Sequence, residues 1–370
     1  MMKKFFLIIL IFTILDTFSQ STPPTPDHIV VLIYENHAYS QIIGSPSAPH
    51  INDLVSDPNS ALFLNSFGIQ HPSQPNYLHL FSGCNQGVND NNVPTDQPFT
   101  TPNLGYQLIA SGKTFVTYSE GLPSVGFNGE VSGSYARRHN PGANWMGTGE
   151  NQIPPETNQP FSAFPYSDFN LLPDVCFVVP DVNNDMHDGT ISTGDNWFYT
   201  NLYEYVQWAK THNSLFILTF DEDNYENDNH IATIFTGQMV VGGAYNDSIN
   251  HYSVLRTIED MFGLPYACNA ATAATISNCW NTTSAILSRQ NNFLVYPNPA
   301  NGFVSIKISD SNLLNHLKLS FINMLGEKVK EVSLNSSHLN IQVDDLTPGI
   351  YLSQLENENG IIEITKIVIE

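Results

Sequence analysis

Two stretches decide the fold: HIVVLIYEN at residues 28–36 and SLFILTFDE at residues 214–222. Each is a β-branched, apolar run, typical of a buried strand, and each ends in polar side chains. In an open α/β sheet, side chains just past the carboxyl ends of the strands converge on one crevice. We therefore expect Glu35 and Asn36 to lie beside Asp221 and Glu222.

These strand ends predict a metal site. Carboxylate and amide oxygens are the ligands that hard cations prefer, and adjacent carboxylates at a buried strand end need a cation or a proton between them. We predict one divalent ion, with Ca²⁺, Mg²⁺ or Mn²⁺ favoured and Zn²⁺ or Fe as alternatives. The predicted ligands are Glu35, Asn36, Ser73, Asp221 and Glu222. The alternative for the first pair is a polar strand end or a helix N-cap.

Ser73 lies in HPSQPNY at residues 71–77, just before a predicted helix. A hydroxyl at a helix N-terminus feels a positive partial charge and lies near free N–H groups. A bound metal would lower its pKa further, so we predict Ser73 as a nucleophile. Asn76 is placed to donate to a substrate oxygen. The alternative is that Ser73 only caps the helix, as serine often does.

Histidines accompany these polar strand ends. We predict that His187 or His230 protonates a leaving oxygen, and that His71 and Asp185 contact substrate. Isolated histidines are often structural, which remains the alternative for each.

Arg137 and Arg138 form a basic cluster with His139. Arginine suits bidentate contacts to phosphate, so we predict that both arginines bind substrate. The alternative is a solvated loop.

The segment from about 27 to 285 alternates strand and helix patterns, which predicts a mostly parallel sheet with helices on both faces. The expected strands are 28–34, 61–67, 114–118, 174–179, 214–220 and 231–235, and the expected helices are 49–55, 74–81, 195–212 and 252–262. Residues 121–170 are rich in Gly, Pro, Asn and Ser, and we interpret them as an insertion that covers the crevice.

The pattern changes near residue 286. Short alternating runs follow, separated by turn signals such as Asn301-Gly302 and Pro348-Gly349, and they predict a small β-sandwich. The expected strands are 303–308, 317–323, 328–334, 339–343, 350–355 and 361–369. The predicted domains are a catalytic domain over 21–286, a linker over 287–298 and a C-terminal domain over 291–370.

The first twenty residues are typical of a secretory signal, with Lys3 and Lys4 before an apolar run at 5–15. That run is too short to span a bilayer, and we expect no transmembrane segment. The net charge is −22, which argues against nucleic acid as a partner. It also makes a bound cation more necessary for any phosphorylated substrate.

Four cysteines are present. Cys268 and Cys279 bracket a short polar loop in an exported chain, so we expect a disulfide between them. For Cys176, a buried core position and a bond to Cys84 are equally compatible with the sequence.

The C-terminal segment resembles the sorting domain of the bacterial type IX secretion system. The resemblance rests on YPNPANG at 296–302, NMLG at 323–326, LTPGIY at 346–351 and TKIVI at 365–369. It implies a bacterium of the Bacteroidetes, type IX machinery as a partner through residues 291–370, and a protein that is secreted or held at the outer cell surface.

Residues of about 28–280 resemble the phosphoesterase family of acid phosphatases and bacterial phospholipases C. Besides the predicted site, the resemblance includes SYARRHNP at 134–141, STGD at 192–195, WAKTHNS at 208–214 and NHY at 250–252. It implies the α/β/α sandwich of the alkaline-phosphatase-like superfamily, with Ser73 as the phosphorylated nucleophile. His187 and His230 stand where many superfamily members place a second metal. The acidic, Asn-rich run 224–229 departs from the family pattern.

Together these observations predict a secreted, metal-dependent acid phosphatase that acts on phosphomonoesters through a phosphoserine. A phosphodiesterase or phospholipase C of the same family is the first alternative. A surface binding protein on this scaffold is the second. Sulfatase activity is disfavoured, because Ser73 lacks the Cys/Ser-x-Pro-x-Arg context of a formylglycine nucleophile.

Overall fold

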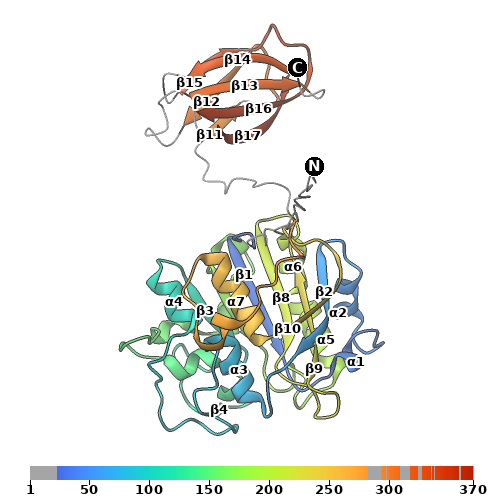
Figure 1. The fold of residues 1–370 in the computed structure, drawn as a ribbon, viewed down its shortest axis with the longest axis vertical. Coiled ribbons are helices and arrows are strands. Elements are labelled where there is room, and N and C mark those ends of the chain that lie inside the picture. The colour runs from blue at the N-terminus through green and yellow to red at the C-terminus, as the bar shows by residue number, and fades with distance from the viewer. Residues whose placement is uncertain are drawn as a thin grey trace, which may run out of the picture. The chain divides into compact units, whose positions relative to one another are not determined.

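The computed structural model describes residues 23–281, 293–296, 298–308, 317–323, 327–334, 336, 338–357 and 360–369. The predicted signal peptide, the boundary at 286 and most of the predicted linker lie outside the described residues. The chain divides into two compact units, Met1–Asn281 and Thr282–Glu370 (Figure 1). Among the described residues, no helix combines the length and apolar character needed to cross a bilayer.

The first unit is built on an eight-stranded sheet in the order β10-β2-β9-β8-β1-β7-β3-β6. Its strands are β1 (His28–Tyr34), β2 (Ser60–Phe67), β3 (Phe115–Ser119), β6 (Asn158–Pro160), β7 (Val175–Val179), β8 (Ser214–Phe220), β9 (His230–Thr236) and β10 (Gly243–Asn250). All neighbouring pairs are parallel except those that involve β9. The predicted mostly parallel sheet is confirmed.

Helices cover both faces of this sheet (Figure 1). Alternate residues of β1 point into opposite cores, with Ile29, Val31 and Ile33 on one side and Val30 and Leu32 on the other. The first core is closed by α3 (Ser73–Ser82), α4 (Leu104–Ala110) and α7 (His251–Phe262). The second is closed by α1 (Tyr39–Ile42), α2 (Pro49–Val55), α5 (Ile191–Asn201) and α6 (Tyr203–Ala209). This is the expected α/β/α sandwich.

The helix predicted over 195–212 is two helices. Leu202 leaves the helical conformation, with φ −127° and ψ −12°, and separates α5 from α6. Its side chain is fully buried in the second core. Burial of Leu202 therefore outweighs helix continuity, which the apolar spacing alone does not reveal.

Residues 121–170 form short pieces rather than one long loop. They are β4 (Val131–Ser132), β5 (Tyr135–Ala136), β6 and the 3-10 turns Arg137–His139, Pro141–Trp145, Pro155–Thr157, Phe161–Ala163 and Phe169–Leu171. Asn140 anchors this segment, because its buried side-chain amide donates to Asn158, Ser119 and Tyr135. The segment is an ordered part of the first unit.

The expected Cys268–Cys279 disulfide is wrong. Cys268 bonds to Cys84 instead, with their Cα atoms 5.9 Å apart, while Cys176 and Cys279 are free and buried. The loop after α7 returns to the end of α3, where Asn269 N donates to Gly83 O. Proximity in the fold, and not closeness in the sequence, sets the pairing.

The C-terminal unit consists of two antiparallel sheets that share one core, as predicted for a β-sandwich. One sheet has the order β11-β12-β15 and the other β14-β13-β16-β17. The strands are β11 (Phe293–Tyr296), β12 (Phe303–Ile308), β13 (Leu317–Asn323), β14 (Lys328–Leu334), β15 (His338–Gln342), β16 (Gly349–Asn357) and β17 (Gly360–Ile369). Ile306, Phe321 and Leu355 are among the residues that fill the core.

Candidate active site

Ser73 is the first residue of α3 and is almost fully buried. The turn before it is held by Asn76, whose side-chain oxygen accepts from the N–H groups of Ile69 and Gln70 and whose amide donates to Gln70 O. This one side chain thus satisfies three backbone groups of the loop that enters the helix. The same amide also donates to Glu222 Oε2 at 3.3 Å, so Asn76 both holds the turn before Ser73 and contacts a predicted metal ligand.

Oxygen atoms of three side chains, which follow strands β1 and β8, surround the Ser73 hydroxyl. Ser73 Oγ lies 2.9 Å from Glu35 Oε2, 3.2 Å from Glu222 Oε1 and 3.4 Å from Asn36 Oδ1. The parallel pairing of Tyr34 with Phe220 brings the ends of β1 and β8 side by side. Asp221 Oδ1 accepts from Asn36 N at 3.0 Å. The structure therefore brings together all five side chains predicted to hold a metal.

The donor set of this oxygen cluster fits a divalent cation. A hydroxyl has one proton, so Ser73 can satisfy only one of its three oxygen neighbours. The buried Asp221 Oδ2 has no hydrogen-bond partner among the described residues. Burial, reinforced by the neighbouring Asp221 charge, raises the pKa values of Glu35 and Glu222, and burial raises that of Asp221. A hard cation would stabilise the ionised form of all three carboxyl groups.

His139 is a site residue that the sequence analysis did not select. Its Nδ1 lies 2.8 Å from Asp185 Oδ2, and its Nε2 lies 3.3 Å from Glu35 Oε1 and has no hydrogen-bond partner among the described residues. Burial lowers the pKa of His139 well below its ordinary value. With Nδ1 donating to Asp185, a neutral His139 presents a bare Nε2 lone pair to the site.

Tyr77 is a second residue that was missed. Its hydroxyl donates to Glu35 Oε1, and its ring stacks on His139 with centroids 5.4 Å apart. Tyr77 lies one helical turn after Ser73, so the same face of α3 carries both. The i, i+4 spacing was readable from the sequence, but a tyrosine there is also typical of the core.

His187 and Arg138 lie at the rim beside His139. The rings of His139 and His187 are 5.6 Å apart, and Arg138 Nη2 is 3.5 Å from His187 Nε2. Asp188 holds His187 Nδ1 at 2.7 Å, and Asp185 accepts from its backbone N–H. Among the described residues, Glu35, His139 and His187 are the one group of three or more histidine, cysteine or carboxylate side chains whose ligand atoms all lie within 4.8 Å of one another, and this group could hold a metal. Asp185 thus positions both histidines.

His71 borders the other side of the oxygen cluster. Its Nδ1 lies 2.8 Å from Glu222 Oε2, and its Nε2 lies 3.3 Å from Asp223 Oδ1. Burial lowers the pKa of His71. Its two ring nitrogens thus face Glu222 and Asp223, which places His71 between the oxygen cluster and the loop after β8.

Two predicted site residues lie outside this arrangement. The ring of His230 stacks on Tyr39, with centroids 4.6 Å apart, and its Nε2 lies 2.8 Å from Leu64 O. Arg137 is buried and its guanidinium donates to Asn128, Asn144, Gln97 and Ala143 O. The Arg137 guanidinium and the Nε2 atom of His230 thus have protein partners, and no contact among the described residues joins either side chain to the oxygen cluster, which differs from their predicted roles.

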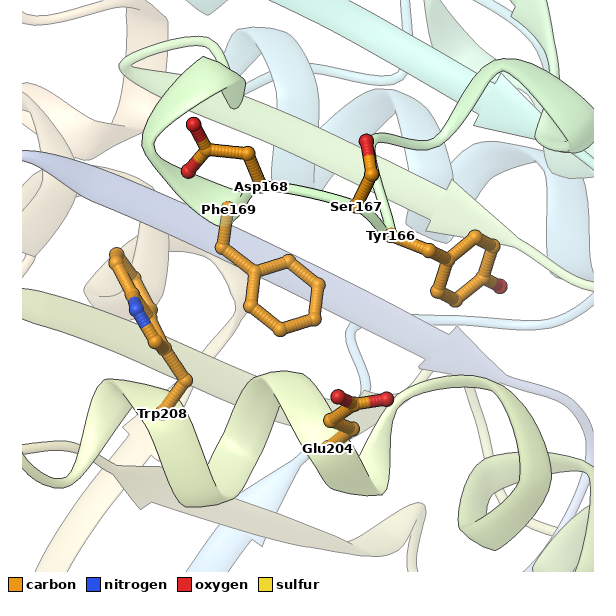
Figure 2. A pocket seen from close by; sticks show the side chains of 6 residues that line it. All are labelled: Tyr166, Ser167, Asp168, Phe169, Glu204 and Trp208. Atoms are coloured by element: carbon orange, nitrogen blue, oxygen red, sulfur yellow. The ribbon is translucent and has the colours of Figure 1, made fainter.

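Two hollows of the first unit differ in their distance from the site. One, of about 360 Å³, adjoins the oxygen cluster through His71 and Asp223. The other, of about 260 Å³, lies over α6 and the 3-10 turn at Phe169–Leu171 (Figure 2). It contains none of the site residues, and Trp208 on its wall packs toward His28 at the start of β1, not at the carboxyl ends of the strands.

Comparison with known proteins places this geometry among phosphoesterases. Residues 48–265 match the model of the "Phosphoesterase family", and residues 294–370 match the "Secretion system C-terminal sorting domain".

The curated relatives are phosphatases by name. The phosphatidylinositol-3-phosphatase of Mycobacterium tuberculosis is 42% identical over 261 residues, covering 70% of this chain and 85% of the relative. The phosphate-repressible acid phosphatase of Penicillium chrysogenum is 30% identical, covering 55% of this chain and 52% of the relative. The chain thus spans about half the length of that fungal enzyme.

Solved structures with a similar fold include a protein of the alkaline phosphatase superfamily from Vibrio parahaemolyticus. The TM-score is 0.47 at 10% identity, and the match covers 91% of this chain and 84% of the other.

Proposed function

We propose that this chain is an acid phosphatase that hydrolyses phosphomonoesters through a phosphoserine at Ser73. The chain belongs to the phosphoesterase family, and it is a secreted or surface-attached phosphoric ester hydrolase. The observation that carries the proposal is the burial of the Ser73 hydroxyl at the start of α3 within an all-oxygen cluster.

In the proposed first step, Ser73 Oγ attacks phosphorus and the bond from phosphorus to the leaving oxygen breaks. The serine proton has an acceptor 2.9 Å away, Glu35 Oε2. His187 supplies a proton to the leaving oxygen, since it is half-exposed and hydrogen-bonded on Nδ1 by Asp188. Arg138 contributes positive charge beside His187 for the phosphoryl oxygens.

In the second step, water attacks the phosphoserine and the bond between phosphorus and Ser73 Oγ breaks, which regenerates the hydroxyl. His139 faces Glu35 with a free Nε2 and is positioned by Asp185, so it can take up a proton at the centre of the site. Tyr77 fixes Glu35 between these groups.

The proposal includes one divalent cation held by Glu35, Asn36, Ser73, Asp221 and Glu222. When bound, it would neutralise the carboxylates and favour the ionised serine hydroxyl. Oxygen donors favour Ca²⁺, Mg²⁺ or Mn²⁺. The relatives' names, all phosphatases, support the monoester over the diester.

The test is hydrolysis of nitrophenyl phosphate beside bis(nitrophenyl) phosphate by the full chain, with and without chelator, from acid to alkaline pH. We expect chelator-sensitive monoesterase activity that is highest in acid. Asp221→Asn should lower kcat/KM by at least about 100-fold, whereas Glu150→Gln, an exposed control, should not change it. Preference for the diester would move the assignment to a phosphodiesterase or phospholipase C. No activity on either ester would favour a binding protein.

A further inference from the structure

The loop after β8 builds one wall of the hollow next to the nucleophile. The hollow measures about 360 Å³ and is lined by Ile69, Gln70, His71, Asp223, Tyr225, Glu226, Asp228 and Asn229. It adjoins the site through His71, whose Nδ1 lies 2.8 Å from Glu222, and Glu222 lies 3.2 Å from Ser73 Oγ. His71 and Glu222 thus link the lining of the hollow to the Ser73 hydroxyl.

The buried Asp223 stabilises the conformation of this loop. Its carboxylate accepts from the backbone N–H groups of Tyr225, Asn227 and Asn229. Asn229 in turn lies against Gly68, where a Cβ atom would come within 2.6 Å of the Asn229 side chain. The loop is therefore preorganised by contacts of its own.

The loop carries the aromatic ring of Tyr225 at the surface. Tyr225 has a left-handed backbone, with φ 68°, and its side chain is exposed, yet its ring stacks on His71 with centroids 3.8 Å apart. A tyrosine in this conformation is unfavourable in isolation, and such strain is concentrated at ligand-binding sites. The stacked pair offers an aromatic surface on the wall of the hollow.

The charge of the hollow is negative. Glu226 and Asp228 are exposed on its rim and Asp223 lies in its wall, while no Lys or Arg lines it. Carboxylates beside an aromatic face attract an ammonium group and repel an anion.

We propose that this hollow is the subsite for the leaving alcohol and that it selects alcohols carrying an ammonium group over neutral or anionic alcohols of the same size. The inference rests on the proposed phosphatase function and adds the substrate class. Tyr225 and His71 would contact the alkyl chain and the cation, and Glu226 and Asp228 would supply the opposite charge.

The test uses three phosphomonoesters of nearly equal size: aminoethyl phosphate, hydroxyethyl phosphate and phosphoglycolate, whose far ends are positive, neutral and negative. We expect kcat/KM for the full chain to fall in that order, by roughly tenfold from the first to the last at low salt. Higher ionic strength should reduce the differences in kcat/KM among the three esters, because the charges on the rim are exposed to solvent.

The key variant is the double substitution Glu226→Gln with Asp228→Asn, which should reduce the preference for aminoethyl phosphate over phosphoglycolate by at least about threefold. The matched control is Glu204→Gln with Asp168→Asn, which removes the same two charges from the rim of the other hollow (Figure 2). This control should keep the full preference. If it loses the preference equally, the overall charge of the protein is responsible and the subsite is refuted.

A second pair of variants tests the aromatic wall. Tyr225→Ala should raise KM for aminoethyl phosphate several-fold, whereas Tyr199→Ala, which removes a ring stacked on His50 in the same way, should not. Hydrolysis of all three esters with equal kcat/KM, or with the neutral ester preferred, overturns the inference and leaves the phosphatase function standing. No hydrolysis of these esters or of nitrophenyl phosphate overturns the phosphatase function itself.

Discussion

Glu35 joins the two halves of the site. One of its carboxylate oxygens faces Ser73, while the other accepts from Tyr77 and faces His139 Nε2 at 3.3 Å. A fully buried carboxylate with such neighbours is costly unless its charge is compensated. Glu35 therefore contacts both Ser73, the proposed nucleophile, and His139.

Asp185 gives a direct test of histidine positioning. Its carboxylate holds the His139 ring and the His187 backbone N–H, each at 2.8 Å. Asp185→Asn keeps the shape but replaces one acceptor by a donor, and we expect kcat/KM to fall about 10–100-fold with the fold intact. The control is Asp195→Asn, because Asp195 is also buried but bonds to the backbone at the start of α2. Equal losses of activity in the two variants would contradict the positioning role.

The buried Glu259 in α7 should make the free energy of unfolding depend on pH, independently of the active site. Its Oε1 accepts from Ala267 N, its buried Oε2 has no hydrogen-bond partner among the described residues, and burial raises its pKa to about 8. The folded pKa lies above the unfolded value of about 4.3, so folding favours the protonated form. Stability from this group is full below pH 4.3 and is lost as pH rises through 8.

We therefore expect Glu259→Gln to raise the free energy of unfolding at pH 8 by on the order of 1–2 kcal/mol and to change it little at pH 4.5. Urea unfolding at the two pH values measures this, with Glu150→Gln as the exposed control. An identical effect of Glu259→Gln at both pH values would show that the group does not titrate as described.

At the residue scale, the sequence predicted the oxygen cluster because its members directly follow strongly patterned strands. Glu35, Asn36, Asp221 and Glu222 are fixed by the ends of β1 and β8, and Ser73 by the start of α3. His139 could not be assigned, since residues 121–170 lack periodicity and its partner Asp185 is 46 positions away. His230 was expected in the site, but its ring stacks on Tyr39 instead. The start of β9 fixes the backbone of His230, whereas the direction of its ring depends on tertiary contacts.

At the scale of elements, α3 carries Ser73, the proposed nucleophile, and ends at a tight contact. Gly83 has φ +70°, and a Cβ there would lie 2.1 Å from Ala267 O, next to the Cys84–Cys268 disulfide. Helices commonly end at such a left-handed glycine. The end of α3 is thus pinned against the loop that follows α7.

Gly83→Ala should be strongly destabilising, while Gly44→Ala serves as its control. Both glycines are left-handed, so both substitutions carry a backbone cost of about 1–2 kcal/mol. A Cβ at Gly44 meets no atom within 4 Å, so only the Gly83 variant adds a steric clash. We expect Gly83→Ala to lose at least about 1–3 kcal/mol more than Gly44→Ala in urea unfolding. Equal losses would contradict the contact.

Elements with one strong pattern were predicted well, and those shaped by tertiary contacts were not. β1, α2 and β8 occur at the predicted bounds. β10 was missed because its GAYNDSIN sequence is polar and mostly exposed, as its place at the sheet edge allows. Such a strand lacks the alternating apolar residues from which a strand is predicted.

At the scale of the whole molecule, the fold class followed from the alternation of strands and helices, and the C-terminal β-sandwich from its turn signals. The Cys84–Cys268 disulfide did not follow from the sequence, because four cysteines allow several pairings. Only the assembled fold brings the loop after α7 back to the end of α3. The prediction of a bound cation rested partly on the net charge of −22, and the buried carboxylates of Glu35, Asp221 and Glu222 are where the proposal places it.

A metal-linked stability follows from these carboxylates. In the absence of a cation, burial raises the pKa values of Glu35, Asp221 and Glu222 above their unfolded values. Stability from these groups is then full in acid and is lost as pH rises and they ionise. A divalent cation binds the ionised form, so its stabilising effect should increase with pH.

We expect the Tm of chelated protein to fall from pH 5 to pH 8, and added Mg²⁺, Ca²⁺ or Mn²⁺ to raise Tm more at pH 8 than at pH 5. Thermal unfolding with and without chelator measures this, and Asp221→Asn should reduce the metal effect. A metal effect that is equal at both pH values would contradict the linkage.

The most direct test of the account is to trap the phosphoenzyme. The full chain is mixed with a phosphomonoester, quenched in acid, digested and analysed by mass spectrometry, beside Ser73→Ala. We predict one added phosphoryl group on the peptide that contains Ser73 in the native chain, and neither the adduct nor turnover in Ser73→Ala. A phosphoryl group on another residue, or full turnover by Ser73→Ala, would contradict the central claim that Ser73 is the nucleophile.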